Sequence, residues 1–303
     1  GAFLIAHRIK RPEPEELAGM IDTYLKFGPK FKSEYNERRP VCFGMPFDGR
    51  TRTAPIYPLT TLVLLSAGQP VVLQGGGPMP VKYGITTQEL FLALGLNLQG
   101  LSLDQVKNGF KKHKLAVIYQ PDHFPLAEKL ITFREEIGKR PPIASMELLW
   151  TSHQGKHLLI SGFVHAPTEE RHWKTLQLMG EEALMTVQGL EGSTDLPTGK
   201  ACKIGSIQKG QIKRISLHSK SYSYSGKDIG FTNIEEWKDQ AMQALNNEGP
   251  LKKSLIWNSG FYLWATGLTK TIETGITKAQ SLIQSDSIKS TLKQLIAWRK
   301  TFA

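Results

Sequence analysis

The sequence has little cysteine and no long apolar run. These two shortages argue against a disulfide-rich protein and against a protein with transmembrane helices. Its 303 residues include two cysteines, Cys42 and Cys202, too few for a disulfide framework or a metal site built on cysteine. Cys42 lies in a strand-like apolar run and is expected to be a small buried side chain. We find no signal peptide and no apolar run near the ~18 residues of a transmembrane helix. We therefore expect a cytoplasmic protein with no membrane partner.

Positive charge is the most distinctive bulk property of the chain. The formal net charge of +11 favours a polyanionic partner such as nucleic acid or a phosphorylated ligand, although a basic pI alone does not require one. The charge is uneven, because residues 121–199 hold 7 basic and 11 acidic side chains whereas residues 200–230 hold 7 basic and 1 acidic. The second segment is therefore the stronger candidate for contact with a polyanion.

The order of the predicted elements indicates an α/β fold with a mostly parallel central sheet. Short apolar runs at residues 41–44, 71–73 and 115–119 are typical of strands, and helical periodicity lies between them. Strands that alternate with helices in this way form parallel sheets. Alternating residues on both sides of Lys209-Gly210 predict a β-hairpin with a basic outer face. Helices near the N-terminus and a C-terminal helical cluster over residues 234–299 complete the prediction.

Two loops follow neighbouring predicted strands and define a candidate site. Residues 45–53 follow the first strand, and residues 74–80 follow the second. The carboxyl ends of neighbouring parallel strands form the crevice in which open α/β sheets bind ligands. Arg50 and Arg52 lie in the first loop at the expected mouth of this crevice, either as solvated charges or as anion contacts.

The order and spacing of the elements resemble the anthranilate phosphoribosyltransferase family and its relatives among the nucleoside phosphorylases. Residues 2–10 are similar to the end of the family's early helix, and residues 249–258 and 265–267 to its C-terminal helix pair. The similarity covers nearly the whole chain. Because the first helix has no start signal, we expect the native chain to begin earlier.

The resemblance implies two domains and a homodimer. The small helical domain would comprise residues 1–35 and about 84–113, with the second segment packed on the first. The α/β domain would comprise residues 40–83 and 114–303 and would hold Mg²⁺ and phosphoribosyl pyrophosphate in the crevice.

The family's phosphate-binding motifs are altered in this chain. Its glycine loop GTGGDG becomes Gly44-Met45-Pro46-Phe47-Asp48-Gly49, in which Pro46 lacks an N–H and Phe47 adds bulk. Its Lys-His-Gly-Asn motif becomes Leu73-Gln74-Gly75-Gly76, and its Asn-x-Ser-Thr segment begins here with Ala54. By this resemblance the crevice residues are Gly44, Asp48, Gly49, Arg50, Arg52, Gln74, Gly75 and Lys82.

The resemblance also suggests metal and acceptor residues. The family's Mg²⁺-binding Asp-Glu pair falls on Thr194-Asp195, so Asp195 with nearby Glu191 are the candidate Mg²⁺ ligands. Arg134 and Arg140 are candidate counterparts of an acceptor-side arginine. No catalytic residue is assigned.

One branch of the family with a degenerate, basic glycine loop is more similar, and some of its members bind nucleic acid, single strands especially, without sequence preference. This similarity and the charge pattern suggest that basic residues follow phosphates while Tyr222 and Tyr224 stack on bases; a solvated hairpin is the alternative. The candidate nucleic-acid residues are Arg50, Arg52, Lys82, Lys203, Lys209, Lys213, Arg214 and Lys220.

Other polar residues have simpler interpretations. Asp122 and His123 follow a strand and could act as acid and base, but Asp122 more often caps a helix. His153 and His157 are four residues apart but bridge a glycine into a strand, so we do not expect a metal site there.

Two functions compete. The first is a nucleic-acid-binding protein on a phosphoribosyltransferase fold, and the second is a Mg²⁺-dependent phosphoribosyltransferase that acts on anthranilate or an unidentified acceptor. A non-catalytic partner subunit is a third possibility. A crevice filled by Phe47, Tyr57 or Met79 favours the first function, whereas a sulfate or phosphate bound in the crevice favours the second.

Overall fold

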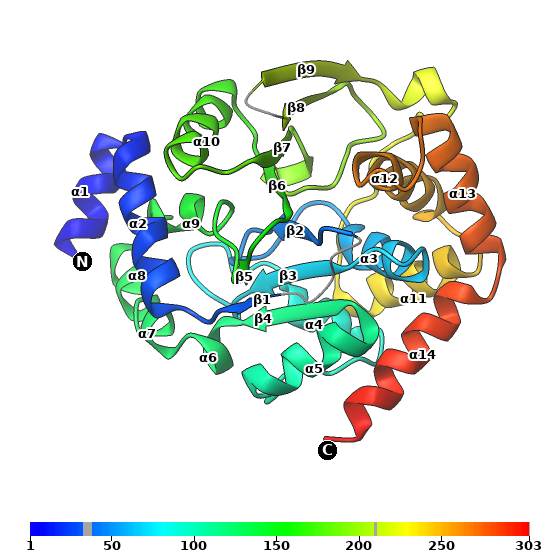
Figure 1. The fold of residues 1–303 in the computed structure, drawn as a ribbon, viewed down its shortest axis with the longest axis horizontal. Helices are drawn as coiled ribbons and strands as arrows, with labels where there is room; N and C mark the ends of the chain where they lie inside the picture. Colours follow the sequence, from blue (N-terminus) through cyan, green and yellow to red (C-terminus); the bar gives the residue numbers. More distant parts are fainter. Residues whose placement is uncertain (33–37, 209–210, 303) are drawn as a thin grey trace.

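In the part of the chain that the computed structural model describes, residues 1–32, 38–208 and 211–302, seven strands form one central sheet (Figure 1). The strand order is β4-β3-β2-β6-β7-β8-β9, and the pairs from β4 to β7 are parallel. The strands are β2 Val41–Gly44, β3 Val71–Gly75, β4 Leu115–Tyr119, β6 Leu158–Gly162, β7 Ala183–Val187, β8 Cys202–Gln208 and β9 Gln211–Leu217. The α/β class and the mostly parallel sheet are confirmed.

The inner strands are apolar because helices cover both of their faces. All residues of β2, β3 and β7 are buried, which is the pattern of parallel strands enclosed on two sides. The edge strand β9 is exposed over most of its length and pairs with β8 in antiparallel register. The predicted basic hairpin is therefore present, and its turn at Lys209-Gly210 lies outside the described residues.

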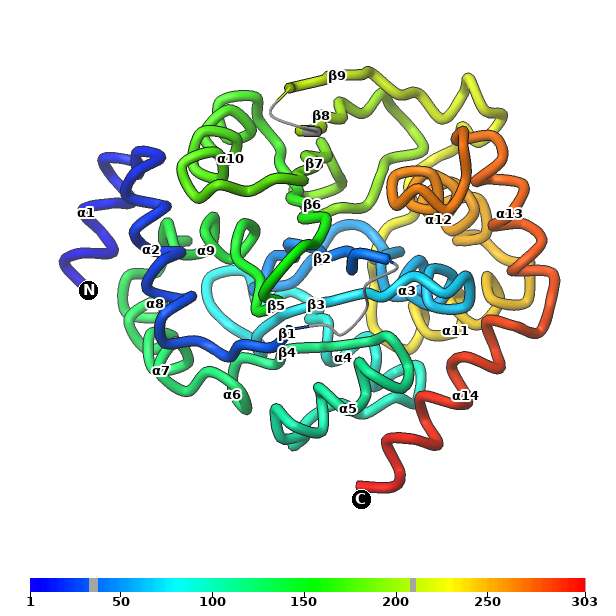
Figure 2. The backbone as a smooth tube through the Cα atoms, in the orientation of Figure 1, coloured from blue at the N-terminus to red at the C-terminus, as the bar shows by residue number. Residues whose placement is uncertain are grey.

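The C-terminal helical cluster lies beside α3, on the right of Figures 1 and 2. Helix α12 is buried on almost every side and packs on α13 and on α3, which follows β2. A helix enclosed in this way needs apolar residues all round. The bounds are α3 Tyr57–Ser66, α11 Ile234–Leu245, α12 Lys252–Ala265, α13 Ile272–Gln284 and α14 Ser287–Lys300.

The N-terminal helices pack on the α/β body beside α10. Helix α1 spans Ala2–Lys10 and α2 spans Pro14–Phe27, and α2 contacts α10 (Ala166–Leu178) and α9 (Ile143–Met146). Residues 84–113, which the resemblance assigns to the small helical domain, hold two helices. Helix α4 (Thr87–Ala93) contacts α11, while α5 (Leu103–His113) contacts β4 and α14, and Figure 1 shows both across the molecule from α1.

The shorter elements complete the description. Capping boxes begin α4 at Thr86 and α5 at Ser102, and the Ser-x-x-Gln pattern at Ser102 is the sequence signature of such a box. None of the helices in the described ranges has the length and apolar character to cross a bilayer. The remaining elements are α4 Thr87–Ala93, α5 Leu103–His113, α6 Gln120–His123, α7 Pro125–Glu128, α8 Ile131–Ile137, β1 Phe31–Lys32, β5 His153–Gln154, η1 Leu190–Gly192 and η2 Ser219–Tyr222.

The close crossing of α12 and α13 gives a test of the packing. A Cβ at Gly260 would lie 2.6 Å from Cγ1 and 2.8 Å from the backbone nitrogen of Ile276. Gly260→Ala should therefore lower the free energy of unfolding by ~1–3 kcal/mol. Gly19 in α2 has open space around it, so Gly19→Ala should raise stability by ~0.5–1 kcal/mol. Urea unfolding measures both, and equal effects of the two substitutions would contradict this packing.

Candidate functional site

The loops after β2 and β3 meet at the carboxyl edge of the sheet. Arg50 and Ile85 form an isolated antiparallel bridge, with Arg50 N donating to Ile85 O at 3.2 Å. Gly49 has φ 73°, and a Cβ there would overlap the carbonyl of Gly84. A side chain is therefore excluded at Gly49, and the two loops are held in direct contact.

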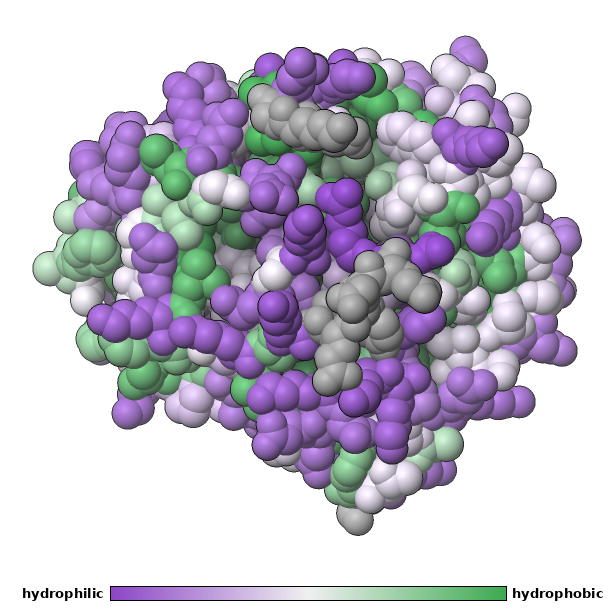
Figure 3. Space-filling view, in the orientation of Figure 1, coloured by the Kyte–Doolittle hydropathy of each residue, from purple (hydrophilic) through white to green (hydrophobic). Residues whose placement is uncertain are grey.

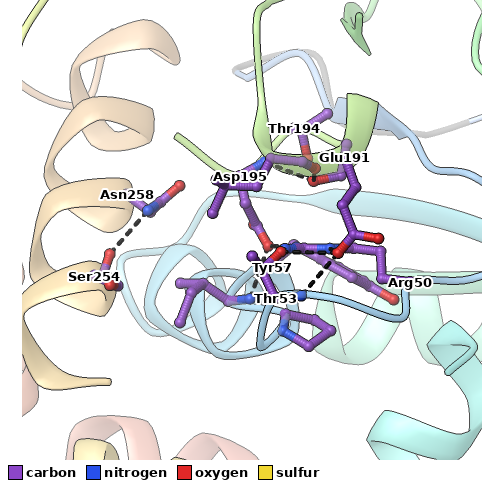
Figure 4. Close-up of polar contacts among 12 residues, drawn as sticks. Arg50, Thr53, Tyr57, Glu191, Thr194, Asp195, Ser254 and Asn258 are labelled. Carbon is purple, nitrogen blue, oxygen red and sulfur yellow. Dashed lines mark hydrogen bonds and ion pairs between the residues drawn. The ribbon is translucent and has the colours of Figure 1, made fainter. Parts of the chain in front are cut away.

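The carboxylate of Glu191 occupies a cradle of backbone N–H groups in the first loop (Figure 4). Thr51, Arg52 and Thr53 donate their N–H groups to it at 3.2, 3.1 and 2.9 Å, and Thr53 Oγ1 donates at 2.9 Å. Successive N–H groups of this kind form an anion-binding concavity. Burial alone would raise the pKa of Glu191, but the N–H donors and Arg50 outweigh it and lower the pKa to about 2.

The guanidinium of Arg50 is enclosed by two carboxylates. It pairs with Asp195 and donates to Thr53 Oγ1, and its Nε lies 3.5 Å from Glu191 Oε1. The residue is 1% exposed, so the expectation that Arg50 lies at the crevice mouth, available to nucleic acid, is wrong. The reason is that Asp195 and Glu191 attract it inward. Burial raises the pKa of Asp195, against the opposing effects of Arg50 and the Ile56 N–H.

Lys82 and Arg52 complete the charge arrangement around Glu191. Lys82 Nζ donates to Gly49 O at 2.8 Å and lies 3.5 Å from Glu191 Oε2. Burial lowers the pKa of Lys82, while Asp48 and Glu191 oppose that shift. Arg52 Nε lies 3.7 Å from Glu191, but its side chain is 77% exposed. Arg52 is therefore the crevice arginine that faces solvent.

Apolar side chains of the two crevice loops and an aromatic ring at the start of α3 are enclosed. Phe47, Tyr57 and Met79 are all buried, and a Cβ at Gly76 would overlap the terminal methyl of Met79. Gln74 Oε1 accepts from Ser152 N at 3.3 Å and its amide donates to Trp150 O. The polar groups of Gln74 are therefore used by the backbone behind the crevice.

The glycines of the crevice serve backbone packing. A Cβ at Gly44 would overlap the carbonyl of Leu148, and one at Gly75 would lie 3.2 Å from Thr87 Oγ1. The backbone of Leu148 therefore leaves no room for a side chain at Gly44, whereas the contact at Gly75 is only tight.

The two acceptor-side candidates have different surroundings. Arg134 is buried and pairs with Glu147 at 2.5 Å, and burial raises the pKa of Glu147 against the effect of Arg134. Arg140 makes a two-point ion pair with buried Asp48, at 2.8 Å from Nε and 3.2 Å from Nη2. Arg140 therefore connects the crevice loop to the surface, whereas Arg134 does not.

Arg140 also lines a basic cleft of about 610 Å³ between α1, α9 and the start of α10, which lie together on the left of Figure 1. Among the described residues that line it, none is acidic. This cleft was not foreseen from sequence. Its lining residues are His7, Arg8, Arg11, Pro12, Arg140, Pro141, Pro142, Ser145, His165, Pro167, Thr168 and Arg171.

Asp195 and Glu191 do not fit Mg²⁺ in this arrangement. Mg²⁺ needs oxygen ligands in octahedral geometry and keeps several waters. Both oxygens of Glu191 accept N–H groups, and Asp195 Oδ2 accepts from Arg50 and, at 2.8 Å, from Ile56 N. Within the described chain Asp195 Oδ1 is buried without a hydrogen bond, but one such oxygen is not a Mg²⁺ site. Arg50 supplies the positive charge between these carboxylates.

The basic residues near the hairpin are exposed, but the two tyrosines lean inward. Lys203, Lys213, Arg214 and Lys220 are exposed, while Lys209 lies outside the described residues. Arg214 lies over the Trp173 ring at 5.3 Å and 3.8 Å from Glu169. The Tyr222 ring packs 5.3 Å from that of Trp257, and Gln280 donates to the Tyr224 hydroxyl at 2.7 Å. These tyrosines are therefore partly used in packing on the C-terminal helices.

His123 and Asp122 have structural partners. His123 Nδ1 accepts from Tyr119 N at 2.9 Å, and its Nε2 lies 2.8 Å from Leu101 O. Asp122 accepts from Gly100 N at 2.7 Å, so it does not cap a helix as expected. Both side chains are therefore held by backbone groups, and the acid–base interpretation has no support in this geometry.

Residues 51–287 match the family described as glycosyl transferase family, a/b domain. The chain is 25% identical over 255 residues to the anthranilate phosphoribosyltransferase of Aromatoleum aromaticum, covering 83% of this chain and 73% of that protein. It is 23% identical over 306 residues to that of Polaromonas sp., covering 100% of this chain and 87% of that protein.

Solved structures show the same fold at low identity. The anthranilate phosphoribosyltransferase of Thermus thermophilus matches with a TM-score of 0.79 at 18% identity, covering 98% of this chain and 88% of that chain. The Saccharomyces cerevisiae enzyme in complex with PRPP and Mg matches with a TM-score of 0.81 at 13% identity, covering 99% and 84%.

The carboxylate of Glu191 should contribute to stability in a pH-dependent way. Glu191→Gln should lower the free energy of unfolding at pH 7 by ~1.5–3 kcal/mol, because hydrogen bonds to a charged acceptor are lost. A carboxyl whose pKa is lowered on folding stabilises the fold above its ordinary pKa, and this contribution disappears as pH falls from 4.5 towards about 2.

Urea unfolding of the wild type and Glu191→Gln at neutral and acid pH measures this difference. Glu182→Gln, at an exposed position, is the control and should change little at either pH. A difference between the wild type and Glu191→Gln that is as large at pH 3 as at pH 7 would refute the assignment.

Proposed function

The chain belongs to the glycosyl transferase family whose a/b domain matches residues 51–287, and from this premise we propose that its phosphate crevice is closed by its own side chains and that it binds nucleic acid through exposed basic surfaces. The observation that carries this proposal is the Glu191 carboxylate in the N–H cradle of residues 51–53. An incoming phosphate would have to displace that carboxylate.

The cost of such displacement favours the proposal. Hydrogen bonds to a charged group contribute about 1.5–3 kcal/mol each, and Glu191 accepts four of them. Phe47 and Met79 fill the neighbouring space. The side chains whose burial was expected to mark a binding protein, Phe47, Tyr57 and Met79, are the ones buried here.

The cations available to a polyanion lie outside the crevice. Arg8, Arg11 and Arg171 line the basic cleft, and Lys213 and Arg214 are exposed on the edge strand β9. Helix α10 links the two regions, because it carries Arg171 at the cleft and packs Trp173 under Arg214. On the face drawn in Figure 3, hydrophilic side chains also gather over α5. A chain of phosphates can contact several such groups at once, which a single small anion cannot.

Binding of single-stranded oligonucleotide should be measurable by fluorescence anisotropy and should weaken steeply with salt. The logarithm of the association constant should fall linearly with the logarithm of salt concentration, by a slope of ~0.7 for each phosphate neutralised. Charge reversal in the cleft should weaken binding at least about tenfold and reduce that slope. The cleft variant carries Arg8→Glu, Arg11→Glu and Arg171→Glu.

The matched control reverses three exposed lysines of the C-terminal helices and changes the net charge equally. It carries Lys238→Glu, Lys253→Glu and Lys293→Glu. If both variants weakened binding equally, binding would depend on net charge alone, and the proposal that the cleft binds nucleic acid would be wrong. Absence of binding by the wild type at low salt would overturn the function.

Phosphoribosyl transfer with anthranilate or another acceptor is the second candidate. It is favoured by the similarity to anthranilate phosphoribosyltransferases. It is also favoured by the ion pair through which Arg140 joins the crevice loop to the basic cleft. A cleft of arginines suits an acceptor that carries a carboxylate. For this function Glu191 and Arg50 would have to leave their present partners so that phosphates could reach the N–H groups of residues 51–53.

Calorimetric titration with phosphoribosyl pyrophosphate and Mg²⁺ separates the two candidates. The closed crevice predicts no binding by the wild type at millimolar ligand, and it predicts a gain of at least about tenfold in affinity for Glu191→Gln, in which the competing charge is absent. Tight binding by the wild type that Glu191→Gln weakens would show that Glu191 serves the ligand, and would favour the transferase.

A further inference from the structure

A cluster of one cysteine and two histidines lies at the amino ends of the parallel strands, whereas the crevice lies at their carboxyl ends. One ligand atom from each of Cys42, His153 and His157 falls within 4.8 Å of the others. Cys42 is 1% exposed and His153 is 2% exposed, while the side chain of His157 is 10% exposed. The cluster is therefore almost enclosed, with its open side at His157.

The fold brings these residues together from separate segments. Cys42 is the second residue of β2 and pairs with Leu159 of β6. His157 immediately precedes β6, and the N–H of Leu158 donates to Pro40 O at 2.9 Å, which holds this end of β6 against β2. His153 lies in β5, and Figure 2 shows the chain from β5 to β6 passing beside β2. The two histidines alone did not predict a metal site, because Cys42 is distant from them in sequence.

The donor set suits a metal of the zinc type. One thiolate sulfur and two imidazole nitrogens are ligands that zinc prefers, whereas Mg²⁺ prefers oxygen. In a tetrahedral zinc site with bonds of about 2.0–2.3 Å, neighbouring donor atoms lie roughly 3.3–3.8 Å apart. Donor atoms within 4.8 Å of one another reach that spacing by small side-chain rotations.

The surroundings of His157 give independent support. Its Nδ1 lies 2.8 Å from Gly155 O, so Nδ1 is the nitrogen that donates to this carbonyl and Nε2 is the nitrogen placed to bind a metal. Ligating histidines in proteins commonly donate their second nitrogen to a backbone carbonyl in this way. Glu181 Oε2 lies 3.3 Å from Nε2, a spacing close to that of two neighbouring tetrahedral ligands, which is about 3.3 Å.

We propose that Cys42, His153 and His157 bind Zn²⁺, with the fourth coordination position facing Glu181. The site joins the start of β2, the β5 segment and the start of β6. It is structural, because it lies at the amino edge of the parallel strands and away from the crevice. Binding therefore stabilises the fold without contributing to events in the crevice or the basic cleft.

Cobalt substitution tests the site directly in the intact chain. After dialysis against chelator, Co²⁺ titration should produce one equivalent of a thiolate-to-cobalt charge-transfer band, together with the visible bands of a tetrahedral site, and Zn²⁺ should displace it. Zn²⁺ should also raise the melting temperature in a concentration-dependent manner. A wild-type protein that shows neither the band nor the rise in melting temperature would overturn the proposal.

Four variants assign the ligands. Cys42→Ser should abolish the charge-transfer band, and His157→Gln at the more open side should weaken Zn²⁺ binding by at least about 100-fold. Glu181→Gln should weaken it about 10-fold or more. Cys202→Ser is the matched control, because Cys202 is equally buried but donates to the carbonyls of Gln188 and Lys203, and it should keep the band.

Circular dichroism shows which variants fold, and His157→Gln provides the test if Cys42→Ser does not. A band that persists in Cys42→Ser, or one lost in Cys202→Ser instead, would place the metal elsewhere. Unchanged Zn²⁺ affinity in folded His157→Gln would equally refute the site.

Discussion

The crevice depends above all on the carboxylate of Glu191. Its backbone is in the left-handed region, with φ 55° and ψ 23°, a conformation that costs a non-glycine residue of order 1 kcal/mol or more. The hydrogen bonds from residues 51–53 and the nearby charge of Arg50 outweigh that cost. Glu191 thereby ties the loop after β2 to the segment after β7, and the neighbouring pair of Asp195 and Arg50 is enclosed with it.

The C-terminal helices hold the same segment from the other side. Tyr262 donates to Thr194 O, and Asn258 accepts from Leu196 N at 2.7 Å. Trp237 donates to Pro55 O at 2.9 Å. The crevice is therefore part of the packed interior, with most of its polar groups paired internally and with Phe47, Tyr57 and Met79 buried. The surfaces proposed to meet anions are formed elsewhere, chiefly by α1, α10 and the edge strand β9.

The two ends of the parallel strands carry different side chains. The carboxyl ends hold an ion-paired network of two carboxylates, an arginine and a lysine, and the amino ends hold a cysteine and two histidines. Each set comes from separate segments that parallel pairing places side by side.

The sequence by itself determined the α/β class, the parallel core of the sheet, the C-terminal helices and the family, because these depend on local periodicity, capping residues and the order of elements. It did not determine that Arg50 is buried. A loop arginine after Asp-Gly is typical of the surface, and its partner Asp195 lies 145 residues along the chain. The sequence likewise did not determine the basic cleft or the cluster of Cys42 with His153 and His157. Only tertiary packing brings such distant residues together, and no local pattern records which of them will meet.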